Sequence, residues 1–146
     1  MVINTENINE ARKQIDKLAK EGKPIIIIGK TIDYNRLLLE SKKINTLILT
    51  HKDQKDRMKQ RESGLNQVLC KIAKENNVSF AIDLKELTQE SKKERAEILA
   101  RIIQNITLIK KYNNKLKLIN YTERNTAFSF LITLGLPTNQ AKEAVN

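Results

Sequence analysis

Residues 24–29 read Pro-Ile-Ile-Ile-Ile-Gly, an aliphatic run without polar alternation. Such a run is typical of a strand that is buried on both faces of a sheet. On its N-terminal side, Asn7 and Glu10 have the spacing of a capping box and predict a helix that ends at Gly22. On its C-terminal side, a helix beginning at Asp33 leads to a second aliphatic strand. Strands that alternate with helices in this way indicate a parallel sheet with right-handed crossovers.

The same alternation continues toward the C-terminus. Ser91 and Glu94 repeat the capping-box spacing and predict the longest helix of the chain. Four strands are predicted, at residues 25–28, 46–49, 78–82 and 116–119. We therefore expect a single α/β domain over residues 1–146. It is either an open parallel sheet with flanking helices or an incomplete TIM-like (β/α) barrel, because a complete barrel takes about 250 residues.

Charge and composition narrow the class of partner. The 146 residues include 27 Lys and Arg against 17 Asp and Glu, and the formal net charge of +10 favours a polyanionic partner. The longest aliphatic run is far shorter than the roughly 18 residues that a membrane-spanning helix needs. The N-terminus lacks the apolar segment of a secretory signal, and the single cysteine, Cys70, cannot form an internal disulfide. We expect a cytoplasmic protein with no membrane partner.

Candidate catalytic groups are few. Residues 29–31, Gly-Lys-Thr, resemble the end of a phosphate-binding P-loop, but Pro24 occupies the position where that loop needs a glycine. The possible nucleophiles are Ser63, which we expect to cap a helix, and Cys70, which we expect in the core. Neither has a base nearby in the sequence. No catalytic residue and no metal ligand are therefore predicted.

The densest group of basic residues follows the second strand. Residues 52–62 contain Lys52, Lys55, Arg57, Lys59 and Arg61, interrupted by three acidic residues. This loop should lie at the carboxyl edge of the sheet, where α/β folds place ligands. A solvated loop is the alternative interpretation.

Two further features bear on the partner. Arg101, Lys110 and Lys111 fall outside the apolar stripe of the long helix and would extend a basic surface. The chain has only three Tyr, three Phe and no Trp, too few for a platform on which single-stranded bases stack. Contacts to the phosphates and 2′-hydroxyls of folded RNA, or to a DNA backbone, fit better.

Residues 59–75, KQRESGLNQVLCKIAKE, resemble a hallmark of protein component 3 of archaeal and eukaryotic ribonuclease P. That hallmark is an Arg-acidic-Ser-Gly-Leu-Asn stretch that leads into a helix. The likeness continues through residues 78–83, 95–112 and 130–136. Two departures stand out. Relatives usually begin with a further strand and helix that this sequence lacks, and their Ser-Gly-Ala turn is replaced by Asn-Tyr-Thr-Glu at residues 120–123.

The resemblance implies a subunit of the ribonucleoprotein that cleaves 5′ leaders from precursor tRNA. In that family the RNA subunit carries the Mg²⁺-assisted chemistry, and the protein pairs with protein component 2 and supports the catalytic RNA. The protein itself is expected to bind no cofactor. Matched to the family pattern, Ser63, Gly64 and Asn66 form a structural turn. The expected RNA contacts are Lys59, Arg61, Arg101, Asn105, Lys110 and Lys111.

Two other functions stay open from the sequence. A metal-dependent phosphoesterase of related barrel fold would need a cluster of His, Asp and Glu at the strand ends, and only His51, Asp53 and Asp83 are candidates. A protein-binding scaffold, whose positive charge serves solubility, is the other possibility.

Overall fold

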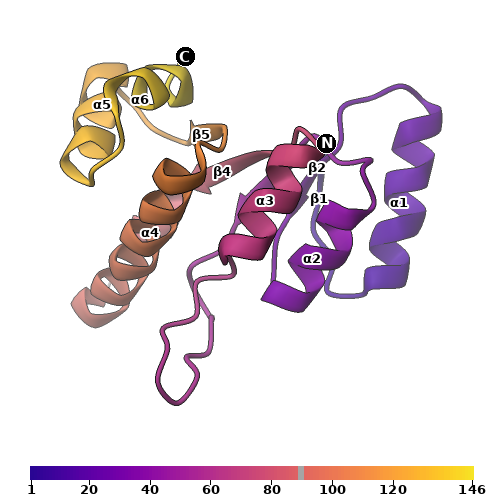
Figure 1. Ribbon diagram of the computed structural model, residues 1–146, viewed down its shortest axis with the longest axis horizontal. Coiled ribbons are helices and arrows are strands. Elements are labelled where there is room, and N and C mark those ends of the chain that lie inside the picture. The colour runs from indigo at the N-terminus through magenta and orange to yellow at the C-terminus, as the bar shows by residue number, and fades with distance from the viewer. Residues whose placement is uncertain (89–90) are drawn as a thin grey trace.

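A parallel β-sheet forms the centre of the computed structural model, which describes residues 1–88 and 91–146 (Figure 1). Within those residues the strands follow one another in chain order, and every neighbouring pair is parallel. They are β1 (Val2–Ile3), β2 (Ile26–Ile28), β3 (Thr46–Leu49), β4 (Ser79–Asp83) and β5 (Leu116–Ile119). The predicted open α/β sheet is thus confirmed. The predicted number of four strands is wrong, because the two-residue strand β1 is too short to leave a pattern in the sequence.

Helices occupy the connections between the strands, and two more helices follow the last strand. They are α1 (Ile8–Lys20), α2 (Ile32–Glu40), α3 (Gln67–Glu75), α4 (Lys92–Tyr112), α5 (Arg124–Thr133) and α6 (Thr138–Ala144), with a 3-10 helix η1 (Leu84–Thr88) after β4. Asn7 and Ser91 cap α1 and α4 as predicted. The start of α2 differs by one residue from the prediction, because the Thr31 hydroxyl caps it through the Tyr34 N–H.

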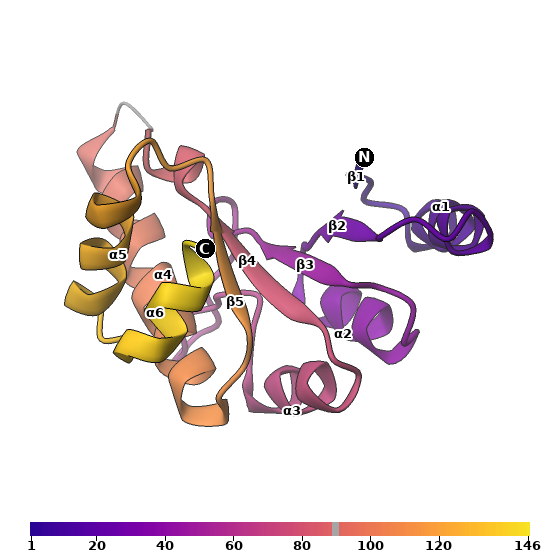
Figure 2. The same ribbon diagram turned by 90° about the horizontal axis from the view of Figure 1, so that it is seen from above.

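The hydrophobic core lies between the sheet and these helices. Alternate strand residues point into it, and they include Ile27, Leu47, Leu49, Phe80 and Ile82. Figure 2 shows α2 and α3 side by side on one side of the sheet, with α1 toward one end and α4, α5 and α6 toward the other. No helix in the described residues is both long enough and apolar enough to cross a membrane.

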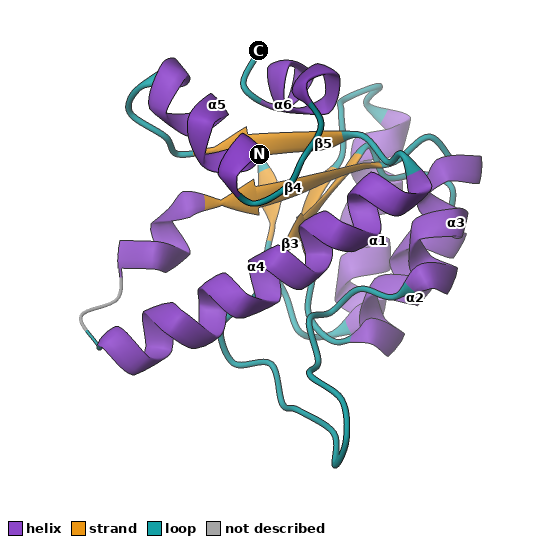
Figure 3. Ribbon diagram, turned by 60° about the vertical axis from the view of Figure 1, so that its left-hand side comes forward, coloured by secondary structure: helices purple, strands orange, loops and turns teal. Residues whose placement is uncertain are grey.

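The connection from β3 to α3 departs from this regular pattern. Residues 50–66 leave the carboxyl end of β3 and form a long loop that projects beyond the helices before α3 begins (Figure 3). The predicted basic segment, residues 52–62, is the projecting part. The fold therefore presents the densest basic stretch at the carboxyl edge of the sheet, as expected.

Candidate nucleic-acid interface

The guanidinium of Arg101 holds the base of the projecting loop. Arg101 lies on α4 and is only 7% exposed. Its Nε donates to the Glu62 carbonyl at 2.9 Å, and its Nη1 donates to the His51 carbonyl at 3.3 Å. Its Nη2 donates to the Gln54 carbonyl at 2.9 Å and lies 3.1 Å from the Asp56 carboxylate. One side chain thus joins four points of the loop to α4.

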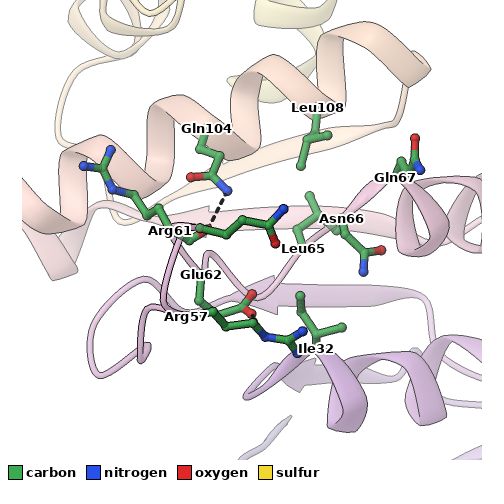
Figure 4. Close-up of a pocket in the computed structure, with 10 residues that line it drawn as sticks. Ile32, Arg57, Arg61, Glu62, Leu65, Asn66, Gln67, Gln104 and Leu108 are labelled. Atoms are coloured by element: carbon green, nitrogen blue, oxygen red, sulfur yellow. Dashed lines mark hydrogen bonds and ion pairs between the residues drawn. The ribbon is translucent and has the colours of Figure 1, made fainter.

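Other hydrogen bonds reinforce this anchor. The Asn105 side chain, one turn further along α4, donates to the Ser63 carbonyl at 3.1 Å. Gln104 donates to the Arg61 carbonyl at 3.0 Å, a bond drawn in Figure 4. Within the loop, the Asp56 carboxylate accepts the Glu62 N–H at 2.9 Å. That N–H, together with the Arg101 guanidinium, holds the pKa of Asp56 below its usual range.

Two of the expected RNA contacts, Arg101 and Asn105, are buried in this structure. The Arg101 guanidinium and the Asn105 side-chain N–H donate to backbone carbonyls of the loop. The physical reason is helical spacing, because Arg101 follows the buried Ile98 by three residues and so shares its face. Because residue 101 is an arginine, the sequence did not indicate that it lies on the buried face. Both residues anchor the loop in this structure, and contact of either one with RNA stays a prediction.

The predicted structural turn lies where the loop joins α3. Gly64 has a φ of +76°, in the left-handed region that favours glycine, and the Asn35 side chain donates to its carbonyl at 2.8 Å. Ser63 is buried and does not cap a helix. The cap is Asn66, whose side-chain oxygen accepts the Leu69 N–H at 2.9 Å, so α3 begins later than predicted. Sequence reasoning missed Asn35, since nothing in its neighbourhood marks a partner 29 residues away.

The outer part of the loop is a tight, basic turn. Arg57 and Gln60 bridge each other through backbone hydrogen bonds of 2.9 and 3.3 Å, so that residues 58 and 59 form the tip. Lys55, Lys59 and Arg61 are exposed, and in the described part of the chain their side chains have no hydrogen-bond or ion-pair partner. These cations are free to meet an anionic partner.

The two lysines expected to extend the surface lie on the same helix as the anchor. Lys110 and Lys111 are exposed in the last turn of α4. They are six and seven residues beyond Gln104, which is roughly 9–10 Å along a helix. Lys111 also lies 5.5 Å from the centre of the Tyr112 ring. The structure thus places both lysines on the element that carries the loop, but not within the loop itself.

A cavity of about 340 Å³ opens beneath the loop (Figure 4). Ile32, Leu65 and Leu108 supply its apolar wall, and Arg57 and Arg61 supply charged groups. It is lined by α2, α3, α4 and the loop, and so belongs to the same interface. Its mixed lining offers both apolar contact and hydrogen bonds.

Two of the candidate metal ligands, His51 and Asp83, take part in hydrogen bonds within the protein. His51 is fully buried, and its Nδ1 lies 2.7 Å from a carboxylate oxygen of Glu86 on η1. The Asp83 carboxylate accepts hydrogen bonds from the Asn120 side chain and the Lys85 N–H. Among the described residues, no group of three or more His, Cys, Asp or Glu is placed to hold a metal ion. The phosphoesterase alternative therefore gains no support from these residues.

Curated proteins and a solved structure similar to this chain carry the name of one ribonucleoprotein, ribonuclease P. No family model matches it. Ribonuclease P protein component 3 of Methanothermobacter thermautotrophicus is 26% identical over 142 residues, which cover 97% of this chain and 54% of that protein. The protein of the same name from Methanosarcina acetivorans is 33% identical over 113 residues, or 77% of this chain and 44% of that protein. The chain thus spans about half the length of these curated relatives.

Solved structures agree on the fold. A chain of archaeal ribonuclease P, seen by cryo-electron microscopy with mature tRNA, superposes with a TM-score of 0.79 at 23% identity. That match covers 98% of this chain and 62% of the other. An uncharacterized protein of known crystal structure matches less well, with a TM-score of 0.62 at 11% identity. By sequence, this chain is therefore similar to ribonuclease P protein component 3, and its fold resembles that of a chain of archaeal ribonuclease P.

Proposed function

We propose that this chain is a protein subunit of ribonuclease P, the ribonucleoprotein that removes 5′ leaders from precursor tRNA. The observation that carries the proposal is the rigidly anchored basic loop at the carboxyl edge of the sheet, in a chain with a net charge of +10. The curated relatives named ribonuclease P protein component 3 support it. A polyanion as large as a folded RNA fits both the charge and the scarcity of aromatic side chains.

The loop would act by positioning RNA. Lys59 and Arg61, at and beside the tip, reach phosphates first, while Lys110 and Lys111 add contacts along α4. Phosphate contacts fix register and orientation without reading sequence. The catalytic step itself belongs to the RNA subunit and the Mg²⁺ that the RNA binds. Protein component 2 is the expected protein partner, and the cytoplasm is the expected compartment.

The loop's part is tested by removing two cations. Lys59→Ala combined with Arg61→Ala should weaken binding to ribonuclease P RNA and reduce its salt dependence. Each lost phosphate contact should change the slope of log affinity against log salt by roughly 0.7–0.9. Arg12→Ala with Lys13→Ala is the matched control, since it removes the same charge from exposed positions on α1. Equal slopes for the two double variants would show that the loop does not contact phosphates.

The subunit role is tested in the assembled enzyme. Reconstitution of ribonuclease P without this chain should slow cleavage of precursor tRNA, because the catalytic RNA loses a protein that supports its fold. Adding the chain back should restore the rate. Cleavage that is unchanged by its omission, across a range of Mg²⁺ concentrations, would contradict the proposal.

A further inference from the structure

The tip of the basic loop carries a methionine that the phosphate contacts do not explain. Met58 is 99% exposed, whereas the other exposed large apolar side chains among the described residues range from 38% to 82%. Burial of an apolar side chain of this size is worth on the order of 1.5–3 kcal/mol. Single exposed apolar side chains are common on protein surfaces, so the inference rests on where Met58 lies, at the tip of the basic loop, rather than on its exposure alone.

The loop holds Met58 in a defined place. Residues 58 and 59 are the two residues between the bridged pair Arg57 and Gln60, so the turn is tight and its tip cannot fold back onto the protein. The base of the loop is held by the buried Arg101 through three backbone carbonyls. Because the backbone that carries Met58 is already ordered, binding costs little further backbone entropy, and this favours binding.

The neighbouring charges identify the partner's chemistry. Lys55, Lys59 and Arg61 lie within three residues of Met58 in the chain, are exposed and have no hydrogen-bond or ion-pair partner among the described residues. A partner that approaches the tip must therefore be polyanionic and must also offer an apolar surface. Nucleic acid meets both conditions, because nucleobase faces are apolar and lie between phosphates. Thioether sulfur makes favourable contacts with aromatic rings, and methionine is among the apolar wedges that unstack bases.

We propose that Met58 packs against the face of an unstacked nucleobase in the RNA partner, while the flanking cations contact the adjacent phosphates. In a continuous A-form helix the base faces are stacked and the major groove is too narrow for side chains. The site on the RNA is therefore a bulge, a loop or the end of a helix. This inference rests on the proposed function and specifies which feature of the RNA the loop recognises.

The test compares variants of the whole chain on two RNA probes. One probe is ribonuclease P RNA, and the other is a continuous RNA duplex without unpaired bases. Met58→Ala should weaken binding to ribonuclease P RNA by about threefold to tenfold, since a contact between a thioether and an aromatic ring contributes on this scale. It should leave the salt slope and the duplex affinity unchanged, because no charge is lost. Met58→Leu should restore affinity and Met58→Gln should not.

The control and the opposing outcomes separate this inference from the proposed function. Ile132→Ala removes an exposed apolar side chain from α5 and should have no effect on either probe. If Met58→Ala binds as the wild type does while Lys59→Ala with Arg61→Ala weakens binding, the inference fails and the proposed function stands. An equal loss on the duplex would also overturn it, as would a loss only of protein component 2 binding. If neither loop variant weakens RNA binding, both proposals fail for this loop.

Discussion

Replacing Arg101 by methionine should detach the basic loop and destabilise the protein. Methionine keeps an unbranched apolar stem and removes only the guanidinium, so the change isolates the hydrogen bonds. The carbonyls of His51, Gln54 and Glu62 then lose their donor. The three carbonyls differ in their exposure to water, and the loss of stability depends on how many of them water can reach.

The bond to the His51 carbonyl is buried, whereas those to Gln54 and Glu62 are partly buried. Leaving the buried carbonyl unpaired costs about 1–3 kcal/mol, and each partly buried bond contributes about 1 kcal/mol. The ion pair with Asp56 adds little, because that carboxylate is half exposed. The expected loss is about 3–5 kcal/mol, a large share of the roughly 5–15 kcal/mol that a domain possesses.

Urea unfolding measures the free energy, and amide hydrogen exchange of residues 51–63 locates the loss. The loop should exchange faster in Arg101→Met, and the dependence of unfolding on urea should weaken, since a detached loop exposes less new surface on unfolding. Arg12→Met, at an exposed position on α1, is the control for lost charge. Equal stabilities for the two variants, with loop exchange unchanged, would refute the anchoring role of Arg101.

Three other measurements test local features. Gly64→Ala should lower the free energy of unfolding in urea by about 1 kcal/mol more than Gly22→Ala does. Both glycines have a positive φ, but only a Cβ at residue 64 would meet neighbouring atoms, at 3.1 and 3.3 Å. Equal losses for the two variants would contradict this crowding. Asp56 has a lowered pKa in the folded state, so its stabilising effect is present above its usual pKa of about 4 and is lost as pH falls through the folded value. The stability difference between the wild type and Asp56→Asn should therefore shrink in unfolding curves below about pH 4, and a constant difference would contradict this. Burial raises the pKa of Cys70 from 9.0 to about 12, so at pH 8 the native protein should show much less thiolate absorbance than the unfolded chain, and equal thiolate absorbance would contradict this.

The regular part of the fold was predictable because its signals are local. Aliphatic runs and capping spacings mark β3, β5 and the start of α4 without reference to the rest of the chain. The strand β1 was not predictable, since two residues show no alternation, and it is recognised only by its pairing with β2. The start of α3 was misplaced because Ser63 and Asn66 are both good capping residues, and only the loop geometry chooses between them.

The position of the candidate site was predictable from the sequence, but its side-chain contacts were not. Parallel strands place their carboxyl ends at one edge, so the location of the basic loop followed from the strand order. The division of its charges into anchors and free groups did not, because Arg101 meets the loop across 39 to 50 residues of chain. Such distant contacts leave no periodic trace in a single sequence. The sequence therefore indicated an exposed Arg101, from its position outside the apolar stripe and from the family pattern.

That division of charges changes what the loop presents to RNA. In the sequence, residues 52–62 carry five basic and three acidic groups, a modest excess of two. In the fold, Asp56 accepts the Arg101 guanidinium and a backbone N–H, and the 13% exposed Glu62 side chain lies 3.6 Å from Arg57. The outward field is therefore more positive than the composition indicates. Under the proposed function, three unpaired cations would give a salt slope of only roughly 2–3, so this loop alone would bind RNA weakly at physiological salt. Stable assembly would then require further contacts, from α4, from the methionine at the tip or from a partner protein, and the loop's own part would be to set orientation.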